Sequence, residues 1–236
     1  MDEDLTAYEQ AIAVNPTAEA YTDLAEQLLE RERPAEAIAI YRRGLAPLPD
    51  NVTLLNDLGT TLADEGELTE AVELLERALE LAPDDAGLLF NLGNFHDLAG
   101  RQQTAISFYR RALRQEPHDL EATYNLALCL QDQEQFADAL DQFARVIEYG
   151  GARPEAAHLN AGLCFSKLGH LAMAEAFYRR SVELEPDYLL GWYNLGCLYE
   201  RLRRPGEALS AFHEAAHCDP DDAEIQERIQ DLKEER

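Results

Sequence analysis

The sequence predicts an all-α fold in which antiparallel helix pairs are stacked one after another. Prolines recur at spacings of 33, 34, 34, 69 and 34 residues, at Pro16, Pro49, Pro83, Pro117, Pro186 and Pro220. Alanines keep the same period, at Ala37, Ala71, Ala105, Ala139, Ala174 and Ala208. A second small residue keeps it too, at Ala25, Gly59, Gly93, Ala127, Gly162 and Gly196. A period of this length indicates a repeat architecture.

Divided in this register, the sequence contains six full units, 18–51, 52–85, 86–119, 120–154, 155–188 and 189–222. The fourth unit is one residue longer than the others, and Gly150 and Gly151 stand where its proline is missing. Each unit contains two helical patterns. In the last unit these patterns are carried by Trp192, Leu195, Gly196 and Tyr199, and then by Ala208, Phe212 and Ala215. We therefore expect two helices per unit, with small residues where their backbones approach closely.

The two ends differ from the full units. Residues 2–17, with Tyr8, Ala11 and the terminal Pro16, match only the second helix of a unit and are predicted to form an N-terminal half repeat. Residues 223–236 place Ile225, Ile229 and Leu232 on one face and charges on the other, which is typical of a polar C-terminal capping helix. The prediction is thus a single array over residues 1–236.

Charge restricts the class of partner. The chain of 236 residues has 46 Asp and Glu against 20 Lys and Arg, a formal net charge of -26. Nucleic acids and anionic membrane surfaces would be repelled, so neither is expected as the main partner. A neutral or basic protein or peptide fits better.

No targeting or disulfide signal is evident. The N-terminus MDEDLTAYEQ is acidic and no apolar run reaches the length of a membrane span, so we expect a cytoplasmic protein without a membrane segment. The four cysteines form no CxxC pair, so neither a disulfide framework nor a cysteine metal site is indicated.

The repeated pattern L-G-x-x-Y, A-x-x-x-F/Y-x-x-A and terminal P resembles the tetratricopeptide repeat (TPR) family over almost the whole chain. His158 and Thr123 depart from it at the first aromatic position, and Val146 and Ser181 at the last small one. The resemblance implies a right-handed α-solenoid, the TPR superhelix, with about fourteen helices here. It also implies a non-catalytic scaffold for protein binding.

The resemblance further implies that the first helix of each unit lines a concave groove. The residue before the Leu-Gly pair points into that groove in the family, and these residues are Asp23, Asp57, Asn91, Asn125, Asn160 and Asn194. An amide donates and accepts, so an asparagine ladder could hold a peptide backbone whatever its sequence. Asparagine also bonds readily to nearby backbone, so local bonding is the alternative.

Neighbouring positions complete the candidate peptide site. Phe90, Tyr124 and Tyr193 precede the asparagines and Asn94 follows one of them. These aromatic groups would suit apolar side chains of a ligand, or they pack between units. Towards the N-terminus the groove positions are acidic, which favours a ligand with Lys or Arg unless these charges form only a solvated face.

A metalloprotease motif is also present, as His213, Glu214 and His217 in HEAAH. A zinc protease needs a third ligand and an enclosed cleft, and the motif falls at variable positions of the repeat, so we expect no enzyme, no metal and no cofactor. His96 and His158 occupy positions of apolar residues and are expected to be core histidines with local hydrogen bonds.

The sequence therefore favours a scaffold that binds an extended peptide or protein segment in the groove. The alternative is a self-assembling module, a homo-oligomer that associates through the uncovered N-terminal half repeat.

Overall fold

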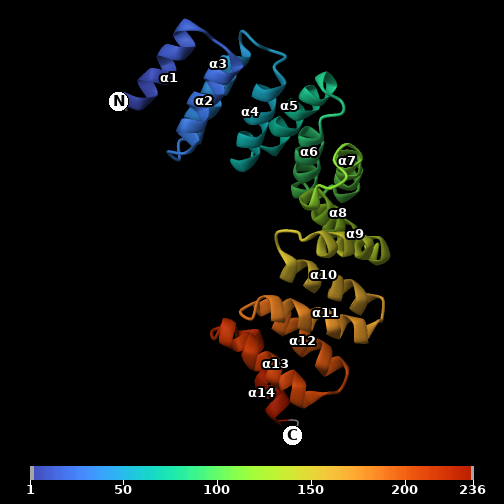
Figure 1. Ribbon diagram of the computed structural model, residues 1–236. Coiled ribbons are helices and arrows are strands. Elements are labelled where there is room, and N and C mark those ends of the chain that lie inside the picture. The colour runs from blue at the N-terminus through green and yellow to red at the C-terminus, as the bar shows by residue number, and fades with distance from the viewer. Residues whose placement is uncertain (1–2, 235–236) are drawn as a thin grey trace. The chain divides into compact units, whose positions relative to one another are not determined.

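The computed structural model describes residues 3–234, and within this range the chain forms fourteen α-helices and no strand (Figure 1). This confirms the predicted all-α repeat fold. Residues 1, 2, 235 and 236, at the outer ends of the predicted half repeat and capping helix, lie outside the described residues. The chain forms two compact units that divide between His118 and Asp119, and each is described by itself.

From residue 3 onward the first unit contains seven helices, and three pairs of them, α2 with α3, α4 with α5 and α6 with α7, pack closely (Figure 1). Their bounds are α1 Glu3–Val14, α2 Ala18–Leu29, α3 Pro34–Leu45, α4 Val52–Asp64, α5 Leu68–Leu81, α6 Ala86–Leu98 and α7 Gln102–Gln115.

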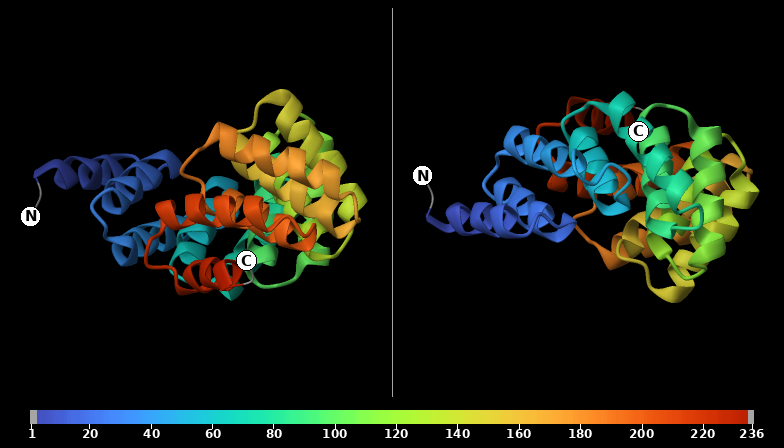
Figure 2. Two further views of the ribbon diagram at one scale, coloured as in Figure 1. Left: turned by 90° about the horizontal axis from the view of Figure 1, so that it is seen from below. Right: turned by 90° about the horizontal axis from the view of Figure 1, so that it is seen from above.

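The second unit, over its described residues, also contains seven helices, with α8 on α9, α10 on α11 and α12 on α13. Their bounds are α8 Leu120–Asp132, α9 Phe136–Tyr149, α10 Pro154–Lys167, α11 Leu171–Leu184, α12 Leu189–Arg201, α13 Pro205–Cys218 and α14 Ala223–Glu234. Figure 2 shows the antiparallel pairing within this unit from two further directions.

In four of the pairs the two helices begin in different ways. Four first helices use a side-chain cap: the side chains of Thr17, Asn51, Asp85 and Asp119 accept hydrogen bonds from backbone N–H groups at the starts of α2, α4, α6 and α8. The first helices α10 and α12 have no such cap, and α10 begins with Pro154. Second helices have no side-chain cap, and α3 and α13 instead begin with Pro34 and Pro205. The N–H groups of a first helical turn have no acceptor within the helix. A capping side chain supplies an acceptor, and a proline in the first turn has no N–H group that needs one.

Small and aromatic residues set the spacing within three of the pairs, whereas in α4 and α5 Gly59 lies against Leu75. Tyr109, Tyr178 and Phe212 from second helices are almost fully buried, and their rings lie directly beside the small residues Gly93 and Gly162 and Gly196 of first helices. A side chain at any of these glycines would meet the ring at 2.6 Å. The sequence pattern of small and aromatic residues therefore reflects direct packing.

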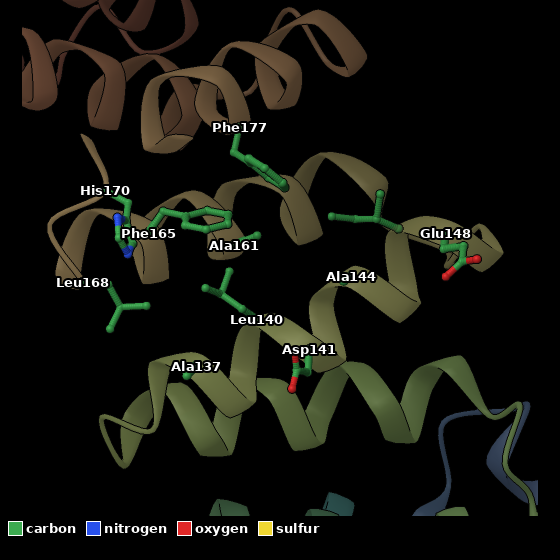
Figure 3. A pocket seen from close by; sticks show the side chains of 11 residues that line it. Ala137, Leu140, Asp141, Ala144, Glu148, Ala161, Phe165, Leu168, His170 and Phe177 are labelled. Carbon is green, nitrogen blue, oxygen red and sulfur yellow. The ribbon is translucent and has the colours of Figure 1, made fainter. Parts of the chain in front are cut away.

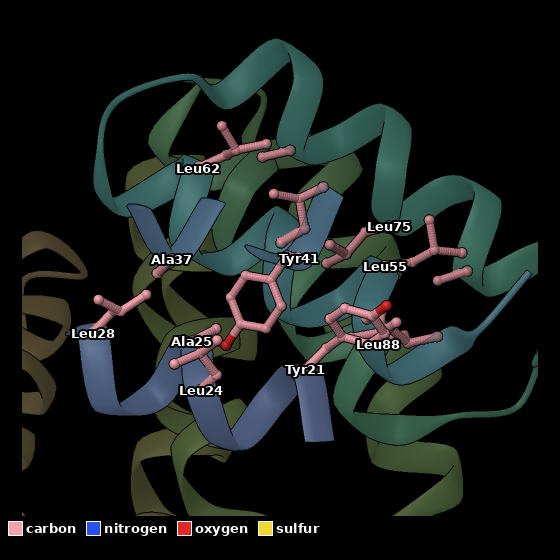
Figure 4. Close-up of a cluster of buried hydrophobic side chains, with 14 of the residues drawn as sticks. Tyr21, Leu24, Ala25, Leu28, Ala37, Tyr41, Leu55, Leu62, Leu75 and Leu88 are labelled. Carbon is pink, nitrogen blue, oxygen red and sulfur yellow. The ribbon is translucent and has the colours of Figure 1, made fainter. Parts of the chain in front are cut away.

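The core of the first unit is built from the same positions. Figure 4 shows the Tyr41 ring of α3 projecting toward Leu24 and Ala25 of α2, with leucines of α4 and α5 beside it. In contrast, Tyr8 of α1 is only half-buried, and Val14 at the end of α1 is 86% exposed. Among the described residues, α1 thus has an outer face that no other helix covers.

No helix within residues 3–234 combines the length and apolar character that crossing a lipid bilayer requires.

Candidate functional site

In the first unit, two of the predicted groove residues, Asp57 and Asn91, belong to a hydrogen-bond chain that links three first helices. Thr22 of α2 donates to Asp57 of α4 at 3.3 Å, and Asn56 donates to the other oxygen of Asp57 at 3.2 Å. Asn91 of α6 donates through Nδ2 to Oδ1 of Asn56 at 2.9 Å. The structure therefore brings Asp57 and Asn91 together through Asn56, whereas Asp23 is exposed on α2 and has no part in these bonds.

Asp57 is half-buried, and its pKa is raised because burial disfavours the carboxylate more than the bonds from Asn56 and Thr22 favour it. None of these partners is a cation. Within the first unit, Asp57 is thus a carboxylate that a cation brought by a ligand would stabilise.

The other two predicted residues of this unit face the second helix of their own pair. Asn94 accepts a hydrogen bond from the Tyr109 hydroxyl at 2.6 Å. Phe90 is half-buried, and its ring centroid lies 6.0 Å from that of Tyr109. Both side chains contact α7, so part of their surface is buried within the helix pair and does not face the predicted peptide site.

In the second unit, Tyr124 is a packed residue. It is 7% exposed, its ring meets the edge of Phe143, and the Arg153 guanidinium lies 4.8 Å from the ring centroid. Burial raises the pKa of Tyr124, and Arg153 and Asn160 oppose the rise. Its hydroxyl accepts a hydrogen bond from Nδ2 of Asn160 at 3.0 Å, which joins α10 to α8.

Asn194 and Tyr193 lie on α12 and make different contacts. Nδ2 of Asn194 donates to the Leu190 carbonyl of its own helix at 2.8 Å. The Tyr193 hydroxyl donates to Glu224 of α14, a bond that together with burial raises the pKa of Tyr193. Asn125 is half-buried on α8. The four asparagines thus occupy equivalent positions, but Asn91, Asn160 and Asn194 have different hydrogen-bond partners.

Two residues that contact predicted site residues were not themselves predicted from the sequence. Arg153 is at the turn before α10, and Glu224 is in the C-terminal helix. Neither lies at a repeated groove position, so the repeat pattern gave no signal for them. Their role is seen only from their contacts in the fold.

The histidines do not assemble a metal site. His213, Glu214 and His217 are exposed on α13, and the described residues contain no group of three His, Cys, Asp or Glu side chains that could hold a metal ion. His158 contacts the Pro154 carbonyl through Nδ1 at 2.7 Å, as expected. His96 is buried, but the expectation of a local hydrogen bond was wrong for its Nδ1, which has no partner among the described residues.

Comparison with known proteins agrees with this geometry. Family models described as tetratricopeptide repeat match residues 5–52 and 56–119, 98–163, 156–188 and 190–222. A segment of 43 residues, 18% of the chain, is 49% identical to tetratricopeptide repeat protein 37 of Xenopus laevis, and this match spans only 3% of that relative.

Solved structures share the fold at low identity. The C-terminal part of a TPR repeat-containing protein from Cytophaga hutchinsonii superposes with a TM-score of 0.77 at 14% identity, covering 96% of this chain and 93% of that one. PilF of Pseudomonas aeruginosa gives 0.73 at 19% identity, covering 92% and 97%. YrrB, described as a TPR protein with an unusual peptide-binding site, gives 0.69 at 24% identity, covering 78% and 95%. Together with the family models that match in succession along the chain, these results show that the chain belongs to the tetratricopeptide repeat family.

Proposed function

We propose that this protein is a non-catalytic scaffold that binds an extended, neutral to basic segment of a partner protein along the faces of its first helices. Membership of the TPR family supports protein binding in general. The similarity of the fold to that of YrrB, a protein described by its peptide-binding site, is consistent with a peptide ligand.

The observation that carries the proposal is the unused hydrogen-bonding capacity of Asn160 and Asn194. Each uses Nδ2 as a donor, and no described residue donates to its Oδ1 atom. Both side chains are half-buried. A backbone N–H of an extended peptide would satisfy such an oxygen without reading the peptide sequence.

Charge supports the basic character of the ligand. The carboxylate of Asp57 is half-buried without a cationic partner in its unit, and the chain as a whole carries a charge of -26. A Lys or Arg side chain of the ligand would gain from this field, more at low salt than at high salt. The same charge disfavours nucleic acid.

The test uses peptides selected on the purified protein from a random displayed library. Changing Asn91, Asn125, Asn160 and Asn194 together to Ala should weaken binding of the selected peptides by about tenfold or more while helicity stays unchanged. The matched control replaces the exposed amides Gln10, Gln103 and Gln133 by Ala and should bind like the wild type. Equal binding by both variants would remove the asparagines from the site.

The exposed face of α1 favours a second candidate function, self-assembly. Tyr8 is half-exposed, whereas Tyr41, Tyr109 and Tyr178 at the equivalent position are at most 2% exposed, and Ala7, Ala11 and Val14 are exposed beside it. Light scattering over a range of concentrations tests this candidate. A strict monomer at high concentration excludes it, and deleting residues 1–15 should abolish any association that is seen.

We also propose that the two units form one array with the repeat boundaries given by the sequence. The break between His118 and Asp119 lies next to a predicted boundary, and the described helices α2 to α13 fall into six pairs.

A further inference from the structure

The second unit has an apolar groove between the second helices α9 and α11. Leu140 of α9, Phe165 of α10 and Phe177 of α11 form its walls and floor, and it encloses about 550 Å³ (Figure 3). The small side chains of Ala144 and Ala161 leave this space open. Leu168, which also lines it, is 42% exposed.

The groove is a departure from the rest of the stack. The position of Ala144 is taken by a long or polar side chain in each of the other full units, namely Arg42, Glu76, Arg110, Arg179 and His213. Leu140 stands at a position that is apolar in every full repeat except the next one, which has Glu175.

Elsewhere some neighbouring second helices are joined by an ion pair. Arg42 of α3 bonds Glu70 of α5 at 2.9 Å, and Arg204, directly before α13, bonds Glu175 of α11 at 2.7 Å. No ion pair joins α9 to α11 within the described residues. At this junction apolar surface therefore lies where the junctions of α3 with α5 and of α11 with α13 have an ion pair.

The groove lies on a different face from the proposed peptide site. Ala161, Phe165 and Leu168 recur at helical spacing on one side of α10 and its end. Asn160 and Lys167 lie on another side of the same helix, since successive residues are rotated by about 100°. Binding in the groove would thus be independent of the asparagines.

The occupant that fits is a helix. The groove is lined by side chains of helices whose backbone groups are already paired, so it offers no partners to the backbone of an extended chain. A helix satisfies its own backbone and presents only side chains. From Ala137 to Glu148 the groove follows α9 for about three turns, or roughly 16 Å.

Two acidic side chains beside the groove indicate which charge the bound helix would carry at its edge. Asp141 and Glu148 are seven residues apart on α9, both are exposed at the groove, and neither has an ion-pair partner among the described residues (Figure 3). A second copy of this chain would be a poor occupant, because α1, the helix with an uncovered face, carries Glu9 and other acidic residues and no Lys or Arg.

We propose that the groove between α9 and α11 binds an amphipathic helix of another protein, with apolar side chains between Leu140, Phe165 and Phe177 and with Lys or Arg residues beside Asp141 and Glu148.

The test measures fluorescence anisotropy of a labelled synthetic helix that has Leu on one face and Lys on the other. Ala144→Arg fills the groove with the residue found at this position in three other units, so folding should be retained, which circular dichroism checks. It should lower affinity by about tenfold or more. The matched control, Ala176→Arg, adds the same charge at an exposed position of α11 outside the groove and should change affinity by less than about twofold.

Two further arms separate packing from charge. The doubly neutralised variant Asp141→Asn with Glu148→Gln should weaken binding mainly at low salt. A peptide of the same Leu and Lys composition in scrambled order should bind at least about tenfold more weakly than the amphipathic one. Equal affinity of the Ala144→Arg and Ala176→Arg variants, or of the two peptides, would overturn the proposal. So would light scattering that showed the wild type to be a dimer and Ala144→Arg a monomer, since a second copy would then be the occupant.

Discussion

The ring of Phe212 fills the space beside Gly196, so that a Cβ atom on Gly196 would lie 2.6 Å from Cε1 of the ring. Phe212 is fully buried and cannot move aside without disturbing the pair of α12 and α13. The contact explains why a glycine is required in the middle of a helix, where it would otherwise be unfavourable.

Replacing Gly196 by Ala should therefore lower the free energy of unfolding by about 1–3 kcal/mol, because the added methyl group overpacks the interface. Urea denaturation followed by circular dichroism measures the change. Gly87→Ala is the matched control, since Gly87 is exposed near the start of α6. There the better helix propensity of Ala should leave stability equal or higher.

His96 gives a second prediction, which concerns stability and pH. Its Nδ1 is buried without a partner, its ring stacks on Phe108, and burial lowers its pKa. The unfolded chain then binds a proton more readily than the folded one. Stability should fall as the pH drops below about 6.5, the ordinary histidine value, through the lower folded value.

His96→Leu should remove this pH dependence and raise the free energy of unfolding at pH 7 by about 1 kcal/mol, since it removes an unsatisfied buried nitrogen. Thermal unfolding at several pH values would check both effects. His213→Leu, at an exposed position, should leave the pH profile unchanged. An unaltered profile in His96→Leu would show that another group titrates.

The turn between the two helices of a pair gives a third prediction. Gly66, Gly100 and Gly169 adopt positive φ in this turn, and so do the non-glycine residues Glu32, Glu134 and Arg203, each at 56°. A side chain in this region is strained, whereas glycine is not.

Glu134→Gly should thus raise stability by up to about 1 kcal/mol, and Gly100→Ala, at φ 70°, should lower it by about 1 kcal/mol. Chemical denaturation again provides the measurement. Glu73→Gly serves as the control, because Glu73 lies within α5 and glycine there should be destabilising. If Glu134→Gly destabilised the protein as much as Glu73→Gly, strain in the turn would not be significant.

The fold could be predicted from the sequence because a packing contact that recurs in several repeats leaves the same residue types at a fixed spacing. Gly196 and Phe212 recur as Gly93 with Tyr109 and Gly162 with Tyr178, so one contact is seen several times in the sequence. The hydrogen bonds of the asparagines could not be predicted in this way. Asn91 finds Asn56 and Asn160 finds Tyr124, but Asn194 bonds to its own helix. These bonds depend on the residue that the preceding repeat has one position before its own groove residue, and this residue varies: it is Asn56 for Asn91, Tyr124 for Asn160, but the apolar Leu159 for Asn194.

The groove at Ala144 differs from both, because it is marked by a residue that departs from the repeat. Its signal, an alanine among long or polar side chains, is present in the aligned units. The sequence alone does not show that this alanine lines a groove, because the groove is formed by side chains of three helices, α9, α10 and α11, which only the structure brings together.

Asp57 gives the last prediction, because stability and binding should respond to it in opposite directions. Its raised pKa means that the folded chain holds the proton more tightly than the unfolded one. Stability is therefore greatest below the ordinary carboxyl value and is partly lost as the pH rises through the folded value, so at pH 7 the charged group is a cost. A ligand with Lys or Arg would recover that cost, which is a physical reason for a binding site to retain such a group.

Asp57→Asn keeps the shape of the side chain and can still accept the hydrogen bond from Asn56. It should raise the free energy of unfolding at pH 7 by about 0.5–1 kcal/mol and weaken binding of a Lys- or Arg-containing peptide by about threefold or more at low salt. Asp23→Asn changes the net charge equally at an exposed position and should leave stability unchanged. Denaturation and anisotropy titrations on the same preparations measure both quantities. If both variants weakened the peptide equally, the overall field would explain the effect, whereas a larger loss in Asp57→Asn would place the cation of the ligand beside Asp57.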